Sequence, residues 1–422
     1  MLKRLRALLP ERALALDIGV LFSGFTLQLL TQVGWLVLAL RVLGPDGYGL
    51  FASLTAVTVA LSFLVGLGSD QLLIRHVAAE PAALRRWLGH GLLATTATGL
   101  PLALLLLLLL PLAEIGRIGT GPLLAVLLAD LLCGRYANLC TVVAIATGQA
   151  GRQSQATVLV GALRLAAIAL AGLLPGGLSI AAWAWWYLGA STLAALGCLA
   201  LVVRDHGWPI PTWINGHWRE GTAFAAEAAL QASVADLDKP IVLQLAGPTE
   251  AGLYAATFRI IGTLYLPLRA LGYAFYGRLF RRPEAERPAY GLRMLPAGLG
   301  IGLAAALGVL LCADLLPLIF GPAYAALPPL LRLVCLMPAA YGAFYLGADV
   351  LSATRRQPLR LGIVTLSLAL TLALCWLAVP LAGIEGASLA RLGVQGLAAL
   401  AVWAFALRRL PPAPAPTGSP AA

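Results

Sequence analysis

Long uninterrupted apolar runs are the feature of this sequence that most restricts its fold. Each run has about 20 residues, the length that a helix needs to cross the hydrocarbon core of a bilayer. Charged residues make up only 11% of the chain, against about 25% in soluble domains, so a soluble fold could not cover its surface with polar groups. The runs are continuous and do not alternate, which excludes a transmembrane barrel. We therefore expect an all-α polytopic membrane protein.

Turn signals between the apolar runs predict twelve transmembrane helices. They cover residues 17–40, 48–72, 88–112, 121–147, 156–174, 181–203, 221–246, 251–275, 294–318, 323–350, 359–380 and 386–407. The domain organisation that we expect is an N-terminal six-helix half (1–203), a cytoplasmic linker (204–220), a C-terminal six-helix half (221–407) and a disordered cytoplasmic tail (408–422). The first helix follows a basic N-terminus without a prompt cleavage site, so we interpret it as retained and not as a signal peptide.

The positions of Lys and Arg in the loops fit this count. Cytoplasmic loops of membrane proteins carry an excess of Lys and Arg. The predicted outer loops hold only Arg41 and Arg117, and the other loop Lys and Arg residues fall on the side that also holds both termini. A missed or extra helix would disturb this alternation, so we expect cytoplasmic N- and C-termini. The same rule explains the net charge of +11 without a nucleic-acid partner.

A short motif occurs once in each half of the chain. "GPDGYGLFA" at 44–52 follows the first predicted helix, and "GPTEAGLYA" at 247–255 follows the seventh, both on the outer side. A weaker echo links "IATGQAGRQ" (145–153) with "LSATRRQPL" (351–359). Repeats at the same step of a six-helix unit predict two parallel halves related by a pseudo-twofold axis, with a central cleft between them.

Three segments carry a family resemblance: "LGPDGYGLFASL" (43–54), "GLGSDQLLIRHVA" (66–78) and "DLDKPIVLQLAGPTEAGLYAATFRI" (236–260). They resemble the polysaccharide-transporter branch of the multidrug/oligosaccharidyl-lipid/polysaccharide (MOP) exporter superfamily, which includes the Wzx-type O-antigen flippases. The resemblance implies alternating-access transfer of an undecaprenyl-diphosphate-linked oligosaccharide, an O-antigen or exopolysaccharide repeat unit, to the periplasmic leaflet of a bacterial cytoplasmic (inner) membrane. It implies coupling to H⁺ or Na⁺, with the lipid-linked oligosaccharide, membrane lipids and other glycan-assembly membrane proteins as partners.

Six ionisable residues fall within the seventh and eighth predicted helices: Glu227, Asp236, Asp238, Lys239, Arg259 and Arg269. Ionisable groups at such depth are costly and face a partner or a wet cavity. Helix geometry places Lys239 and Arg259 beside the two aspartates, with Glu227 and Arg269 at a second level nearer the cytoplasm. These residues either form ion pairs that join the two helices, or bind substrate and the coupling ion.

In the N-terminal half, Arg135 and Arg164 have only Asp130 as an acidic neighbour within the predicted helices. This leaves a surplus of positive charge, and an arginine offers a planar fork of donors that suits a diphosphate. We therefore predict that Arg135 and Arg164 face the cleft and bind the diphosphate. Arg332 has Asp314 as a candidate neighbour.

Uncharged polar and aromatic residues give weaker candidates. Gln28, Thr31 and Gln32 form a polar stripe on the first helix, which serves either a helix–helix hydrogen bond or contact with the sugar. The cluster Trp183, Trp185, Trp186 and Tyr187 is typical of an interfacial aromatic belt, more than of a sugar-stacking platform.

The sequence contains no reactive constellation that predicts an enzyme. Its four histidines lie near the cytoplasmic face without metal-ligand spacing, and its six cysteines lie in apolar runs without a CxxC pair. We therefore expect no catalytic residue, metal or cofactor. A cation-coupled drug exporter of the MATE type is the closer alternative, and a glycan polymerase or glycosyltransferase, which has large external loops, is the more distant one. The surplus of arginine within the helices favours a lipid diphosphate over a cationic drug.

Overall fold

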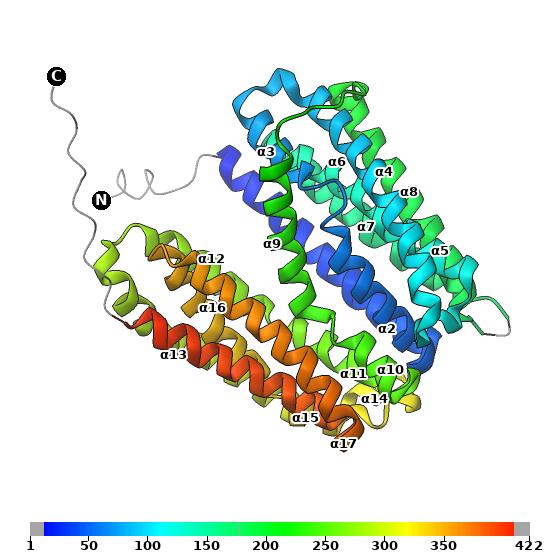
Figure 1. The fold of residues 1–422 in the computed structure, drawn as a ribbon, viewed down its shortest axis with the longest axis vertical. Coiled ribbons are helices and arrows are strands. Elements are labelled where there is room, and N and C mark those ends of the chain that lie inside the picture. The colour runs from blue at the N-terminus through cyan, green and yellow to red at the C-terminus, as the bar shows by residue number, and fades with distance from the viewer. Residues whose placement is uncertain (1–11, 176, 409–422) are drawn as a thin grey trace. The chain divides into compact units, whose positions relative to one another are not determined.

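The computed structural model describes residues 12–175 and 177–408, which are mostly helical and contain no strand (Figure 1). The prediction of an all-α fold is confirmed. The predicted tail lies outside the described residues except for Arg408. The chain forms two compact units, which we describe separately. Unit 1 comprises residues 1–255 and 317–325, and unit 2 comprises residues 256–316 and 326–422.

Unit 1 is a bundle in which α7 packs between α2 and α8. Its elements are α2 (Arg12–Ser62), α3 (Ser69–Ala79), α4 (Leu84–Leu109), α5 (Thr120–Leu128), η4 (Ala129–Cys133), α6 (Gly134–Ala146), α7 (Ala150–Ala171), α8 (Ile180–His206), α9 (Trp218–Asp236), α10 (Lys239–Ala246), the start of α11 (Pro248–Thr263) and most of α14 (Leu316–Phe320). Leu73, Leu88 and Leu139 are fully buried in one of its apolar clusters.

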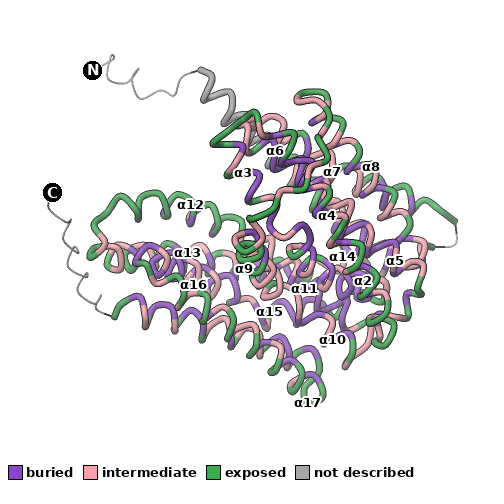
Figure 2. Tube along the Cα trace, turned by 45° about the horizontal axis from the view of Figure 1, so that its top comes forward, coloured by how far each residue is buried: buried purple, intermediate pink, exposed green. Residues whose placement is uncertain are grey.

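Unit 2 is a smaller bundle in which α16 packs against both α13 and α17. Its elements are the end of α11, α12 (Leu266–Phe280), α13 (Arg287–Cys312), α15 (Leu327–Leu333), α16 (Met337–Ala353) and α17 (Gln357–Ala406). Leu346, Val350 and Val402 lie in its core. α12 is mostly exposed along its length (Figure 2).

Seven helices are long and apolar enough to cross a membrane, or eight if the bent pair Pro322–Leu333 and Met337–Ala353 forms one span. Large apolar side chains are exposed on several of them, among them Leu311 (71%) and Leu381 (86%). Exposed apolar area on this scale is expected only where lipid replaces water. A multi-pass membrane protein is confirmed, and the count of twelve helices stays a prediction.

Two of the longest helices, α2 and α17, are hairpins and not straight rods. α2 has 51 residues and is broken at Gly44, whose φ of 65° lies in the left-handed region that glycine tolerates. The rings of Trp35 and Phe51 are 6.1 Å apart, whereas sixteen residues of straight helix would separate them by about 24 Å. α17 is broken at Ala382 and Gly383, and Cys375 Sγ lies 4.0 Å from the carbonyl oxygen of Ala387. Each of these helices therefore turns back on itself.

The two copies of the repeated motif, residues 44–52 and 247–255, contact each other in unit 1, and we call each copy a GP motif. A Cβ atom on Gly49 would overlap the carbonyl oxygen of Pro248, and a Cβ atom on Gly252 would overlap that of Pro45. These contacts are reciprocal, because Gly49 and Gly252 are the sixth residues of their motifs and the two prolines are the second. The Thr249 hydroxyl also donates to Asp46, the residue at the same third position. The motif is repeated because each copy packs its backbone against the other.

The segment 207–217 joins α8 to α9 and is held against α3 and α4. The Ile210 amide donates to the carbonyl oxygen of Arg85 at 2.9 Å, and Arg85 Nε donates to that of Trp208 at 2.7 Å. Gly89 allows this approach, because a Cβ atom there would overlap the backbone of Ile210. The linker predicted at this position is therefore an ordered part of unit 1.

Candidate functional site

A buried carboxylate, Asp130, is the centre of a polar network inside unit 1. Asp130 is 6% exposed, and both of its oxygens accept hydrogen bonds: from the Tyr187 hydroxyl at 2.6 Å and from the Thr58 hydroxyl. Arg164 lies over the Tyr187 ring at 4.9 Å and is close enough to Asp130 to interact with it electrostatically. The proximity of Arg164 and Asp130 expected from the sequence is thus confirmed.

Asp130 lies in η4 (Ala129–Cys133), a single turn of π-helix between α5 and α6. Such π-bulges are rare and are frequent at functional sites, because they change the direction of side chains within a helix. A sequence gives no signal for a π-turn, so this feature was not predicted.

The aromatic residues of α8 surround this network, which corrects the prediction of an aromatic belt for two of them. Trp183 is fully buried and Tyr187 is 4% exposed, and both contact the ring of Phe51 at 5.9 and 5.1 Å. Only Trp185, at 55% exposure, has the position expected for a belt residue. The prediction failed because Trp183 and Tyr187, four residues apart, share the side of α8 that faces the protein interior, whereas Trp185, two residues from each, lies on the opposite side.

Arg135 has an acidic partner that the sequence analysis did not identify. Its guanidinium lies 3.2 Å from Asp70, and the Asn138 amide donates to the same carboxylate at 3.5 Å. The side chains are 6% and 13% exposed. The expectation of unmatched charge at Arg135 was therefore wrong, because Asp70 comes from α3, 65 residues away in sequence. Asp70 lies at the cytoplasmic end of the second predicted helix (48–72), and no local pattern in the sequence connects that end with Arg135.

Asp70 also lines the larger of the two pockets of unit 1 that we describe. Its walls come from the residue after α2 (Phe63), from α3 and from α9, and they enclose about 600 Å³, counting the open mouth. Glu227 of α9 lines it too, and Gln231 donates to Glu227 at 3.4 Å. The pocket therefore carries two carboxylates, with the Arg135 guanidinium beside one of them.

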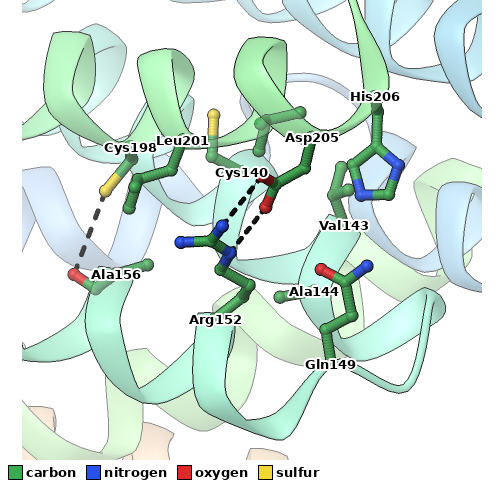
Figure 3. A pocket seen from close by; sticks show the side chains of 11 residues that line it. Cys140, Val143, Ala144, Gln149, Arg152, Ala156, Cys198, Leu201, Asp205 and His206 are labelled. Atoms are coloured by element: carbon green, nitrogen blue, oxygen red, sulfur yellow. Dashed lines mark hydrogen bonds and ion pairs between the residues drawn. The ribbon is translucent and has the colours of Figure 1, made fainter.

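The second pocket lies between α6, α7 and α8 and is crossed by an ion pair (Figure 3). Arg152 of α7 donates to Asp205 of α8 at 2.8 Å through one nitrogen and lies close to its second oxygen through another. Cys140 and Cys198 line the apolar end. Because Asp205 and Gln155 together engage all three nitrogens of the Arg152 guanidinium, we interpret this ion pair as a structural contact between α7 and α8.

The predicted charged pair at the end of α9 is present. Lys239 contacts Asp236, three residues earlier, and its side chain is 7% exposed. Asp238 is 2% exposed and accepts a hydrogen bond from Tyr254 at 2.5 Å. Lys239 also contacts the hairpin of α2, because its backbone carbonyl oxygen accepts a hydrogen bond from the Ser53 hydroxyl at 3.3 Å.

The other predicted site residues are dispersed over both units. Gln28 is half-buried, and its backbone carbonyl oxygen accepts a hydrogen bond from the Thr31 hydroxyl at 2.8 Å. Gln32 is exposed. In unit 2, Arg259 is half-buried on α11 and Arg269 is exposed on α12. The predicted neighbours of these two arginines, Asp236, Asp238 and Glu227, belong to unit 1, so those pairings stay predictions. Arg332 contacts Asp314, as expected.

Within the described residues, no group of three or more His, Cys, Asp or Glu side chains is placed to hold a metal ion.

The chain matches the family "Polysaccharide biosynthesis protein" over residues 14–265, which is more than half of its length. The chain belongs to this family. The match confirms the resemblance to the polysaccharide-transporter branch of the MOP superfamily, and it includes both copies of the GP motif.

Solved structures show the fold that this polysaccharide biosynthesis family member shares. A multidrug resistance MATE family transporter of the MOP superfamily, in an inward-facing conformation, matches with a TM-score of 0.75 at 14% identity over 90% of this chain and 93% of that one. A MOP superfamily transporter from Pyrococcus furiosus, described by a reversed polarity of its binding pocket, gives 0.64 at 14% identity over 92% and 93%. A Vibrio cholerae MATE transporter in a bent form gives 0.59 at 18% identity over 94% and 97%. The curated proteins gave no match.

Proposed function

We propose that this protein is a flippase that transfers an undecaprenyl-diphosphate-linked oligosaccharide, an O-antigen or exopolysaccharide repeat unit, from the cytoplasmic to the periplasmic leaflet of a bacterial inner membrane. The observation that carries the proposal is membership of the polysaccharide biosynthesis family, matched over residues 14–265. The MATE-like fold supports a transport mechanism by alternating access and not a catalytic one. The substrate joins an anionic diphosphate to a glycan rich in hydroxyls, and the chain supplies arginines for the first part and polar side chains for the second.

The architecture that we propose has twelve membrane spans in two parallel six-helix halves, 1–203 and 221–407, joined by the linker 204–220, with both termini and the tail in the cytoplasm. The hairpins within α2 and α17 support it, because each divides a helix of 50 residues or more into two arms of membrane-spanning length. The reciprocal packing of the two GP motifs supports a pseudo-twofold axis. Cysteines at Asp46 and Thr249 should both be labelled by an impermeant thiol reagent from outside, and labelling from opposite sides would refute the parallel arrangement.

The diphosphate contacts that we propose are Arg135, Arg164, Lys239, Arg259 and Arg269, with Gln28 and Gln32 toward the glycan. Arg135 and Arg164 each retain a buried Nε–H without a hydrogen-bond partner among the described residues. A guanidinium that is paired with a carboxylate through one nitrogen can therefore still offer a donor to an anion. Coupling to H⁺ or Na⁺ would use carboxylates: Glu227, Asp236, Asp238 and the π-turn residue Asp130.

The decisive experiment follows the transbilayer movement of a defined lipid. The purified protein is reconstituted into vesicles that contain undecaprenyl diphosphate bearing one N-acetylglucosamine, and an external galactosyltransferase reports the sugar that reaches the outer leaflet. The proposal expects complete labelling of the lipid at a rate that depends on protein, and labelling of only the outer half in vesicles without protein. Equal labelling in the two preparations would reject the flippase.

A cation-coupled exporter of the MATE type is the second candidate. Two observations favour it: the structural similarity to MATE transporters and the two carboxylates in the larger pocket of unit 1. In this case a pH or Na⁺ gradient should drive accumulation of ethidium in the same vesicles, while the lipid-linked sugar stays unlabelled. The paired assays therefore separate the two candidates with one preparation.

A further inference from the structure

Four tyrosines of unit 2 gather on neighbouring faces of two helices. Tyr341 and Tyr345 are one turn apart on α16. Tyr265 and Tyr273 lie at the start and in the middle of α12, with Arg269 four residues from each. Residues four apart on a helix share a face, so each helix presents one stripe. We call these four residues the tyrosine surface.

Three of the rings form a near-parallel stack. The centroids of Tyr265 and Tyr341 are 3.9 Å apart with an interplanar angle of 2°, and those of Tyr341 and Tyr345 are 5.8 Å apart at 25°. Gly272 makes room for the third ring, because a Cβ atom there would overlap Tyr345. The stack is therefore built into the packing of α12 against α16, which fixes the positions of the rings.

The tyrosine surface is accessible, unlike the core tyrosines of this protein. Tyr265, Tyr341 and Tyr345 are half-buried and Tyr273 is 76% exposed, whereas Tyr254 and Tyr324 are at most 1% exposed. A stack that served only to fill the core would be covered. Here the side chain of Tyr273 and parts of the other three residues are exposed on unit 2.

Charged groups of both signs surround the hydroxyls. Arg269 and Arg391 lie close enough to the Tyr265 hydroxyl to interact with it electrostatically. Arg269 and Asp349 both lie close enough to the Tyr345 hydroxyl to interact with it electrostatically. Asp349 is 6% exposed, and among the described residues no donor bonds its buried Oδ2. A buried carboxylate oxygen without a donor is costly, so a hydroxyl group brought beside this oxygen would stabilise it.

We propose that the tyrosine surface binds pyranose rings of the transported glycan, with the C–H face of a sugar against the exposed aromatic surface and its hydroxyls bonded to Tyr345 and Asp349. A sugar hydroxyl both donates and accepts, so it matches a site with an acceptor and a donor side by side. An apolar lipid tail would leave these groups unbonded. A diphosphate would be repelled by Asp349, and a cation by Arg269 and Arg391. The inference rests on the proposed function and specifies which residues take the glycan.

The test compares two lipids, so that the contribution of the sugar is measured separately from that of the diphosphate. Binding of undecaprenyl diphosphate, and of the same lipid bearing one N-acetylglucosamine, is measured on the full chain in nanodiscs. We expect the wild type to bind the glycosylated lipid about tenfold more tightly, the scale of one good aromatic contact. Tyr345→Phe, which keeps the ring and loses the hydroxyl, and Tyr341→Leu, which loses the ring, should reduce this ratio to about twofold or less.

Affinity for the unglycosylated lipid should be the same in all of these proteins, which shows that the variants are folded. Tyr290→Phe is the matched control, because Tyr290 also stacks on an aromatic ring (Phe275, 5.5 Å) beside an arginine (Arg282, 4.3 Å) in unit 2. Its ratio should equal that of the wild type. A tenfold ratio that persists in both test variants overturns the glycan site, and so does a wild type that binds the two lipids equally. Binding of neither lipid by the wild type would instead reject the proposed function and the glycan site together.

Discussion

Asp130 of unit 1 and Asp349 of unit 2 are equally buried, at 6% exposure, yet their surroundings differ. Both oxygens of Asp130 accept hydrogen bonds, from Tyr187 and Thr58. Asp349 keeps a buried oxygen without a donor among the described residues, beside the accessible tyrosine surface. A satisfied buried carboxylate stabilises its surroundings, whereas an unsatisfied one destabilises them until something binds.

A buried ion pair of unit 1 and an exposed ion pair of unit 2 show a similar contrast. In unit 1, Arg135 and Asp70 are paired at low exposure, and the GP motifs pack backbone against backbone. In unit 2, Arg282 and Glu286 form a pair that is exposed by 43% and 60%, as surface pairs are. The buried pair and the contacts between motifs therefore stabilise unit 1, whereas the exposed pair contributes little to the stability of unit 2. Four experiments test this contrast.

The largest effect is expected where the GP motifs meet. In Gly49→Ala the new methyl group would overlap the Pro248 carbonyl and lie 2.7 Å from the Gly252 nitrogen, so backbone must move. We expect a loss of about 4 kcal/mol or more, seen as failure to accumulate in the membrane. Gly262→Ala, on the unit 2 part of α11, is the matched control, because no heavy atom lies within 4 Å of its new methyl group. Normal accumulation of Gly49→Ala would show that the contact between motifs is not structural.

The next experiment compares the two carboxylates directly. Asp130→Ala removes the acceptor of two buried hydroxyls and the anion near Arg164, and we expect it to lower the free energy of unfolding by about 3 kcal/mol. Asp349→Ala removes an unsatisfied oxygen, so the apo protein should be unchanged or more stable. Thermal unfolding in the same detergent measures both. Equal destabilisation by the two substitutions would abolish the distinction between the units.

Some of these features could be predicted from the sequence and others could not. Apolar run length gave the helical membrane class, and the i,i+3 spacing placed Lys239 beside Asp236, because both signals are local. The repeated motif indicated paired turns, since Gly-Pro is itself a turn signal. The Arg135–Asp70 pair and the Tyr265–Tyr341 stack join residues 65 and 76 positions apart. Such contacts depend on how helices rotate and pack, and a single sequence does not encode that register in any local pattern.

A double-mutant cycle on Arg135 and Asp70 should give a smaller but clear effect. Each single change to alanine leaves one charge buried, and the double change removes both, so we expect a coupling energy of about 2 kcal/mol. The cycle on Arg282 and Glu286 should give no more than about 0.5 kcal/mol, because water and salt screen an exposed pair. Unfolding midpoints of the seven proteins, the wild type and three variants for each cycle, provide both numbers. Similar couplings in the two units would contradict the contrast in burial.

The smallest effect is a pH dependence that we expect in unit 1 alone, since all four histidines precede residue 218. His76 stacks on Trp87 at 4.1 Å and faces His217, Arg75 and Glu220. Burial, with smaller effects from His217 and Arg75, lowers the pKa of His76 below 6.5 despite the opposing effect of Glu220. As the pH falls, His76 therefore takes up a proton at a higher pH in the unfolded chain, or where the segment 207–217 has detached from it, than in the folded protein. The stability that the neutral His76 side chain contributes to the folded state is fully present above pH 6.5 and is lost as the pH falls through the lowered pKa.

Hydrogen exchange of the segment 207–217 reports this loss, because its Ile214 amide donates to His90 in the same cluster at 3.2 Å. After correction for the intrinsic pH dependence of exchange, protection of this segment should decrease below pH 6.5, while that of α16 in unit 2 stays constant. His76→Gln, which cannot take up a proton, should make the decrease shallower. His206→Gln should leave it unchanged, because His206 lies outside the cluster of rings formed by His76, Trp87, His90 and His217. A parallel loss of protection in 207–217 and α16 would mean that the acid sensitivity does not come from the histidines, and that the two units respond as one.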